Sequence, residues 1–112
     1  MNDVLFRVET PLKYFATLRR QNWEKHEQKR EDIRGLMEQV RATLIEPDVV
    51  ITDNTGCDHY YGWGYGSGRT ADAFLHVLVR RYDIDDENEY TVATIWFART
   101  PVKGEVRWTK TS

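Results

Sequence analysis

One histidine of this chain lies among several positively charged residues. His26 follows Trp23 and precedes Lys29, Arg30 and Arg34. Histidine is the usual proton carrier near neutral pH, and neighbouring cations favour its neutral form, which accepts a proton. His26 is therefore our first candidate for a general base. The alternative is a surface histidine on a charged helix.

A second candidate is a run from Tyr60 to Arg69 in which glycines alternate with aromatic or small residues. The run lacks the GxxxxGK[ST] pattern of a phosphate loop, and no helical pattern follows it as a dinucleotide site requires. Trp63 and Tyr65 on such a loop can stack on unpaired bases while Arg69 contacts a phosphate. The alternative is a glycine-rich connection whose aromatic side chains fold back onto the sheet.

A third candidate lies on two strand-like segments. His76 and Arg80 fall on the same side of the segment 74–82, and Thr94 lies on the segment 90–98. An arginine that is partly buried needs a carboxylate partner or an anionic ligand. The alternative is that the side chains of His76 and Arg80 reach solvent or bind one of the many carboxylates of the chain.

The sequence favours neither a metal site nor a cofactor. The acidic run 83–89 lacks the glycine and flanking helices of an EF-hand, and we interpret it as a solvated hairpin tip. Cys57 is the only cysteine, so the common zinc spacings and an intramolecular disulfide are excluded. Nothing marks a base for Cys57 as a nucleophile, and we interpret it as incidental.

Composition indicates a small globular protein with one domain, residues 1–112. The chain is 40% hydrophobic with a net charge of −2, so it is not a polycation, and no apolar run is long enough to cross a bilayer. No secretion signal is visible, and with a single cysteine this predicts a cytoplasmic protein without a membrane partner. Because the acidic run carries much of the negative charge, a locally positive face remains available.

The N-terminal half predicts strands followed by helices. Residues 4–8 and 14–18 are short β-prone runs that indicate a hairpin or two edge strands. A short helix is expected over 22–29, with Asn22 as its N-cap. A second amphipathic helix, ended by Pro47, is indicated by an apolar stripe with helical spacing: Ile33, Leu36, Met37, Val40 and Leu44.

The C-terminal half predicts strands throughout. They are expected over 48–52, from 59 onward, over 74–82 and over 90–98, with a short tail that contains Val106 and Trp108. The sequence therefore predicts an α+β fold. Short N-terminal strands and helices would pack on one face of a roughly four-stranded antiparallel sheet.

Several short elements occur in one order along nearly the whole chain. They are Thr10-Pro11-Leu12, Trp23-x-x-His26, Leu44-x-x-Pro47-Asp48-x-Val50, Tyr60-Tyr61, Leu75-His76-Val77-Leu78-Val79, Val92-x-Thr94-x-Trp96-x-x-Arg99 and Lys103-Gly104-Glu105. Together they resemble the small phage- and toxin-associated nuclease-like domains grouped with barnase, EndoU, colicin nucleases and RelE, the BECR superfamily. Each element alone is weakly specific, and the resemblance rests on their order and spacing.

This resemblance implies a metal-independent endoribonuclease of toxin or phage type, with a helical N-terminal part and a four-stranded antiparallel sheet. Position by position, His26 matches the helix histidine of such domains, Tyr61 their strand tyrosine and Thr94 their late-strand hydroxyl. We add Arg80, with Arg69 as second choice, as the cation that stabilises the phosphorane when the 2′-OH attacks its own phosphate.

RNA is the expected partner, through a set of basic and aromatic residues: Lys29, Arg30, Trp63, Tyr65 and Arg69. The chain departs from the resemblance at 30–33, where such domains often carry His-Pro-Glu. The alternative function is therefore a catalytically inactive module that binds RNA or protein on the same fold. The substrate RNA, a cognate inhibitor protein and the oligomeric state stay open.

Overall fold

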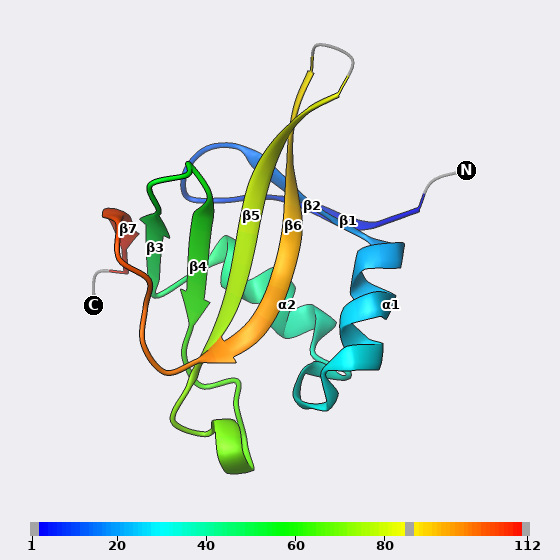
Figure 1. The fold of residues 1–112 in the computed structure, drawn as a ribbon, viewed down its shortest axis with the longest axis vertical. Helices are drawn as coiled ribbons and strands as arrows, with labels where there is room; N and C mark the ends of the chain where they lie inside the picture. Colours follow the sequence, from blue (N-terminus) through cyan, green and yellow to red (C-terminus); the bar gives the residue numbers. More distant parts are fainter. Residues whose placement is uncertain (1–2, 85–86, 111–112) are drawn as a thin grey trace.

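The computed structural model describes residues 3–84 and 87–110, and its N-terminal half places two strands before two helices (Figure 1). The elements are β1 (Val4–Glu9), β2 (Phe15–Arg19), α1 (Arg20–Lys29), a 3-10 turn (Glu31–Ile33) and α2 (Met37–Ile45). β1 and β2 pair antiparallel, so the predicted N-terminal hairpin is confirmed.

The C-terminal half consists of strands joined by loops. They are β3 (Val49–Thr52), β4 (Asp58–Gly62), β5 (Phe74–Ile84), β6 (Glu87–Ala98) and β7 (Glu105–Thr109), with a 3-10 turn (Gly68–Thr70) between β4 and β5. β5 and β6 form a long antiparallel pair that extends from Phe74↔Ala98 to Ile84↔Glu87. Part of the acidic run therefore continues these strands, and residues 85 and 86 at its centre lie outside the described residues.

All of these strands belong to one seven-stranded mixed sheet in the order β1-β2-β6-β5-β4-β3-β7. The prediction of a roughly four-stranded antiparallel sheet is wrong. The N-terminal hairpin joins the sheet through a short parallel pairing, Ala16↔Tyr90 and Thr17↔Thr91, and the C-terminal tail adds β7 to the edge of β3. Local sequence patterns cannot show a pairing between segments more than 70 residues apart.

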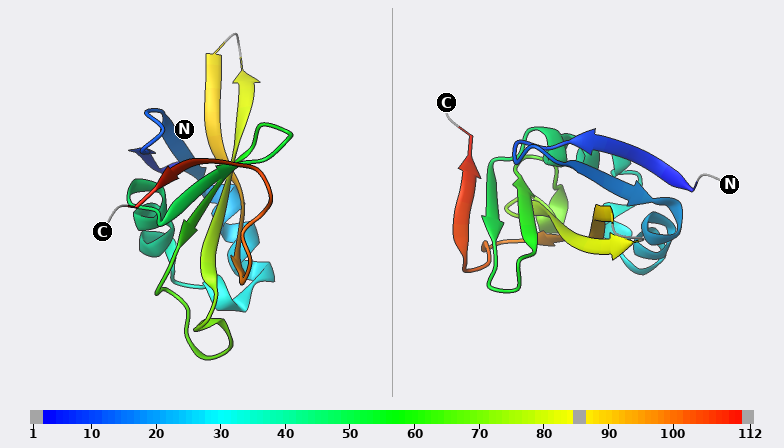
Figure 2. Two further views of the ribbon diagram at one scale, coloured as in Figure 1. Left: turned by 90° about the vertical axis from the view of Figure 1, so that its left-hand side faces the viewer. Right: turned by 90° about the horizontal axis from the view of Figure 1, so that it is seen from above.

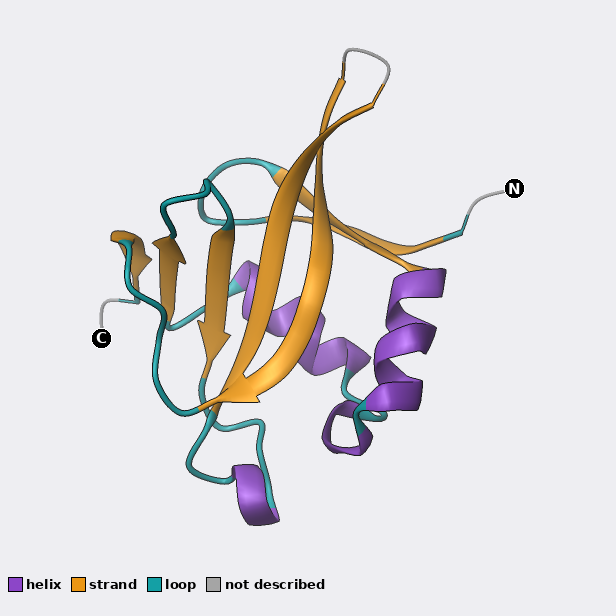
Figure 3. Cartoon of the chain, in the orientation of Figure 1, coloured by secondary structure: helices purple, strands orange, loops and turns teal. Residues whose placement is uncertain are grey.

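α2 and the core lie on one face of this sheet, which we call the inner face, and α1 lies at the edge formed by β6 (Figure 3). Figure 3 shows α2 behind β4 to β6 and α1 beside β6. The left view of Figure 2 also shows α2 to one side of the sheet. Leu75, Val77 and Val79 of β5 belong to the core, so His76, Leu78 and Arg80 lie on the opposite, outer face.

The apolar stripe of the sequence does not form one continuous helix. Ile33, Val40 and Leu44 are fully buried, as the stripe predicts, but a 3-10 turn and Gly35 separate Ile33 from α2. Gly35 has a φ of 74°, in the left-handed region, where glycine carries no steric penalty. The stripe therefore identified the core residues correctly while overestimating the length of the helix. α2 ends at Ile45, two residues before Pro47, as expected.

Two neighbouring residues of α2 offer a test of this packing. Leu44→Ala should lower the free energy of unfolding by about 2–5 kcal/mol, because the Leu44 side chain is fully buried in the core. Ile45→Ala is the matched control, since Ile45 is 37% exposed, and should cost less than about 1 kcal/mol. Urea unfolding monitored by circular dichroism measures both. Equal losses in the two variants would contradict the orientation of α2.

Candidate functional site

The helix α1 lies beside the edge of β6 because β2 leaves that edge early. After Thr17↔Thr91 no further β2–β6 pair forms among the described residues, and the chain turns into α1 at Arg20. The Asn22 side-chain amide donates hydrogen bonds to the backbone carbonyls of Val92 and Ala93. Asn22 lies inside the first turn, so the prediction that it is the N-cap of α1 is wrong: its side chain bonds to the sheet instead.

A cavity of about 460 Å³, which we call the seam cavity, opens where α1, β5 and β6 meet. Its lining includes Asn22 from α1, Arg80 from β5 and Thr94 from β6. Arg80 pairs with Thr91 across the strands and Leu78 pairs with Thr94, so these side chains share the outer face. The structure thus brings together two predicted catalytic residues, Arg80 and Thr94.

The two arginines that line the seam cavity, Arg19 and Arg80, differ in their ion pairs. Arg19 binds Asp3 at 3.0 Å and Glu89 at 2.6 Å, so its guanidinium is already neutralised. The Arg80 side chain is exposed, as the alternative interpretation expects, so it is not a buried arginine that requires a partner, and it has no carboxylate partner among the described side chains. Hydrogen bonding to the Cys57 thiol, and next to the Tyr82 hydroxyl, raises the pKa of Arg80, which therefore stays a cation. Arg80 is the cation of this cavity that is available to a ligand.

His26 lies on α1 one turn beyond Asn22 and is not part of the cavity lining. Residues four apart share one side of a helix, about 6 Å apart along its axis. His26 Nδ1 lies 2.8 Å from the backbone oxygen of Asn22. Because a carbonyl oxygen can only accept, Nδ1 carries the proton, and in the neutral ring Nε2 holds a free lone pair. His26 is therefore held in a tautomer that can accept a proton at Nε2.

The other end of α1 carries the predicted RNA-binding residues. Lys29 and Arg30 line a second cavity, of about 480 Å³, together with Arg69 from the loop between β4 and β5. Glu31 and Asp32 lie on the same wall. Arg69, which is distant in sequence, is thus a neighbour of the other two predicted RNA-binding residues, at the C-terminal end of the helix that carries His26.

The three predicted aromatic residues lie elsewhere. Tyr61 is fully buried, burial raises the pKa of its hydroxyl, and that hydroxyl accepts a hydrogen bond from the backbone N–H of Val102 at 2.8 Å. Tyr65 is partly buried against the core, as the alternative interpretation of the glycine-rich run expects. Trp63 is 51% exposed and meets Phe74 edge to face, with ring centroids 4.9 Å apart. Only Trp63 of the three is placed to contact a ligand.

A hydrogen-bonded chain of two histidines and a carboxylate crosses the outer face. Asp53 Oδ2 lies 2.7 Å from His59 Nε2, and His59 Nδ1 lies 2.7 Å from His76 Nε2. Both rings are buried, and His76 packs under Trp96 with ring centroids 3.7 Å apart. The sequence analysis missed Asp53 and His59, because only the register of β3, β4 and β5 brings them to His76.

The two ends of this chain differ. The bond from His59 lowers the pKa of Asp53, so the carboxylate accepts from His59 Nε2. The next hydrogen bond joins His59 Nδ1 and His76 Nε2, and the remaining ring nitrogen is His76 Nδ1. That atom is buried without a hydrogen-bond partner in the described part of the chain. Burial, and then the nearby His59, lower the pKa of His76 to about 3, so His76 stays neutral.

Within the described ranges, no group of three or more histidine, cysteine or acidic side chains is arranged to hold a metal ion. No helix of the described chain is both long enough and apolar enough to span a bilayer. Comparisons of the chain with family models, curated proteins and solved structures found no match. The resemblance to the BECR superfamily therefore stays a prediction.

The buried His76 predicts a specific loss of stability in acid. Between its usual pKa of about 6.5 and its folded pKa of about 3, the unfolded chain binds a proton at His76 that the folded chain does not. The free energy of unfolding should therefore fall with decreasing pH in this window, by up to about 1.4 kcal/mol per pH unit from this group. Urea unfolding at pH 6.5, 5.5 and 4.5 measures the slope.

His76→Phe should flatten that slope, whereas His26→Gln, which removes a histidine from the surface of α1, should leave it in place. An unchanged slope in His76→Phe would show that His76 is protonated in the folded chain.

Proposed function

We propose that this chain is a cytoplasmic, metal-independent endoribonuclease of the BECR type that acts at the seam between α1 and β6. The observation that carries the proposal is that Arg80 and Thr94 line one cavity with Asn22, on whose helix His26 follows one turn later. Asn22 and His26 on α1 are distant in sequence from Arg80 and Thr94 on the strands, and His26, Arg80 and Thr94 were each candidates from the sequence. A charged guanidinium without a carboxylate partner among the described residues favours an anionic substrate.

The chemistry requires few protein groups because RNA supplies its own nucleophile. His26 Nε2 takes the proton of the 2′-OH, the 2′ oxygen attacks the adjacent phosphorus, and the bond from phosphorus to the 5′ oxygen breaks. That oxygen takes a proton from water, and a 2′,3′-cyclic phosphate remains. A positioned base contributes about 10²–10⁴-fold to such a rate. Arg80 stabilises the charge that develops on the phosphorane, worth about 10²–10³-fold, and Thr94 donates a hydrogen bond.

The remaining basic residues extend this site along the helix. Lys29, Arg30 and Arg69 would hold phosphates of the same strand beyond His26, because they line the cavity at the far end of α1. RNA is the proposed partner, and an inhibitor protein would act by covering this seam.

A second candidate function, binding without cleavage, is favoured by the exposed Trp63. Its ring lies against Phe74, whose strand neighbours His76 and Arg80 share the outer face. An aromatic side chain placed in this way can stack on a base without any catalytic group nearby. The two functions differ in whether bound RNA is cut.

The proposal is tested with end-labelled single-stranded RNA in EDTA. The chain should release fragments that end in a 2′,3′-cyclic phosphate, and RNA methylated at every 2′ oxygen should stay intact, because its nucleophile is blocked. His26→Gln and Arg80→Gln should each lower the cleavage rate by at least about 10²-fold.

Lys25→Gln on α1 and Arg41→Gln on α2 are matched charge controls that line none of these cavities, and they should cleave as the parent does. RNA that is bound but stays intact at micromolar protein would support the binding function instead. RNA that is neither bound nor cut would contradict both proposed functions.

A further inference from the structure

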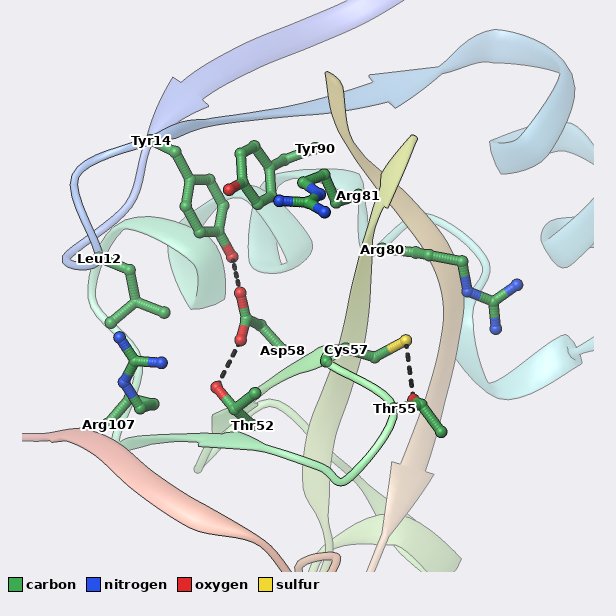
Figure 4. A pocket seen from close by; sticks show the side chains of 11 residues that line it. Leu12, Tyr14, Thr52, Thr55, Cys57, Asp58, Arg80, Arg81, Tyr90 and Arg107 are labelled. Carbon is green, nitrogen blue, oxygen red and sulfur yellow. Dashed lines mark hydrogen bonds between the residues drawn. The ribbon is translucent and has the colours of Figure 1, made fainter. Parts of the chain in front are cut away.

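A third cavity, of about 480 Å³, lies beside the turn between β3 and β4, and its lining includes Asp58, Arg81 and Arg107 (Figure 4). Arg81 and Tyr90 are cross-strand partners. Arg81 lies two residues from Val79 and Tyr90 two residues from Val92, so both share the inner face with that pair. Arg107 of β7 closes the opposite wall. We call this space the arginine cavity, and the proposed ribonuclease site does not use it.

The carboxylate of this cavity is already engaged by neutral donors. Asp58 Oδ2 accepts from the Tyr14 hydroxyl at 2.7 Å, and Asp58 Oδ1 accepts from the Thr52 hydroxyl at 2.6 Å. The Tyr60 hydroxyl donates to Tyr14 at 2.7 Å, so the chain of hydroxyls converges on Asp58. Burial, and next the neighbouring Tyr60, raise the pKa of Tyr14, which therefore stays a neutral donor. Asp58 of β4 thus links the turn before β2 with β3.

The two arginines that face this cavity are left without counter-ions. Neither Arg81 nor Arg107 forms an ion pair with any described side chain. Figure 4 shows Arg81 beside Tyr90 and Arg107 beside Leu12 and Thr52, whereas Arg80, at the margin, turns away from Tyr14 and Asp58. Both side chains are exposed and are therefore solvated in the free chain, and together they give this cavity a positive charge that an anionic ligand can neutralise.

The same cavity offers a flat apolar surface. Tyr14 and Tyr90 stack with ring centroids 3.7 Å apart and an angle of 8° between their planes, and Leu12 lies on the same side. A planar ring can rest against such a wall while an attached anionic group reaches the arginines. The volume lies within the range of sites that bind small molecules.

We propose that the arginine cavity binds a nucleoside monophosphate. Its phosphate would lie between Arg81 and Arg107, and its base would rest against Tyr90 and Leu12. The two cavities share Arg80 at their margin, but Arg81 and Arg107 do not line the seam cavity, so binding here requires no RNA cleavage and survives if the proposed ribonuclease activity is absent.

Isothermal titration calorimetry at low salt, with AMP, adenosine and inorganic phosphate as separate ligands, tests the proposal. AMP should bind with one site per chain, and adenosine should bind at least about tenfold more weakly because it lacks the phosphate. Inorganic phosphate should also bind more weakly than AMP, because it cannot use the apolar wall. Raising the salt concentration should weaken AMP binding, since these arginines are exposed.

Arg81→Gln and Arg107→Gln should each weaken AMP binding about tenfold or more, whereas Arg41→Gln, an exposed arginine of α2, should leave it unchanged. Thermal unfolding of each variant verifies that it is folded. Absence of saturable AMP binding, or AMP binding that neither variant weakens, would overturn the site. Phosphate binding as tight as that of AMP would overturn the assignment of a nucleotide.

Discussion

The contact between the Asn22 side chain and the carbonyl edge of β6 determines where a site can form. An unpaired strand edge exposes backbone groups that need partners, and β2 covers β6 only as far as Thr91. Beyond that point Asn22 satisfies the carbonyls of Val92 and Ala93, next to the irregularity that offsets β6 against β5 between Leu78 and Val79. A helix thereby replaces a strand at this edge, and the groove between helix and sheet becomes the seam cavity.

The carboxylates of the β3–β4 hairpin explain how a chain with a net charge of −2 keeps arginines available. Asp53 binds His59 and the backbone N–H groups of its own turn, and Asp58 binds Tyr14 and Thr52. Both carboxylates are therefore satisfied by neutral or weakly basic donors within the fold. Arginines on either side of the sheet, Arg80 and Arg81 among them, therefore keep no carboxylate partner among the described residues, although the net charge of the chain is negative.

The sequence predicted best what depends on local pattern. The apolar, strand-like runs 74–82 and 90–98 predicted the long strand pair, and the stripe through Val40 and Leu44 predicted the helical part of the core. The helix was predicted too long because the positive φ of Gly35, which separates Ile33 from α2, cannot be read from the apolar spacing. The parallel pairing of β2 with β6 and the contact of His59 with His76 depend on register between distant segments. For the same reason Tyr61 was a plausible site residue that proved to be buried.

The most direct measurement of the seam as a binding site is a two-dimensional NMR titration with single-stranded RNA methylated at every 2′ oxygen, which binds without being cut. If the strand lies along α1, the ring signals of His26, the side-chain signal of Arg80 and the amide signal of Thr94 should shift together with one dissociation constant. The backbone amide signal of Arg41, an exposed residue of α2 that lines neither the seam cavity nor the cavity at the end of α1, should stay nearly unchanged. Shifts confined to Trp63 and Phe74, with His26 and Arg80 unaffected, would contradict the placement of the site at the seam.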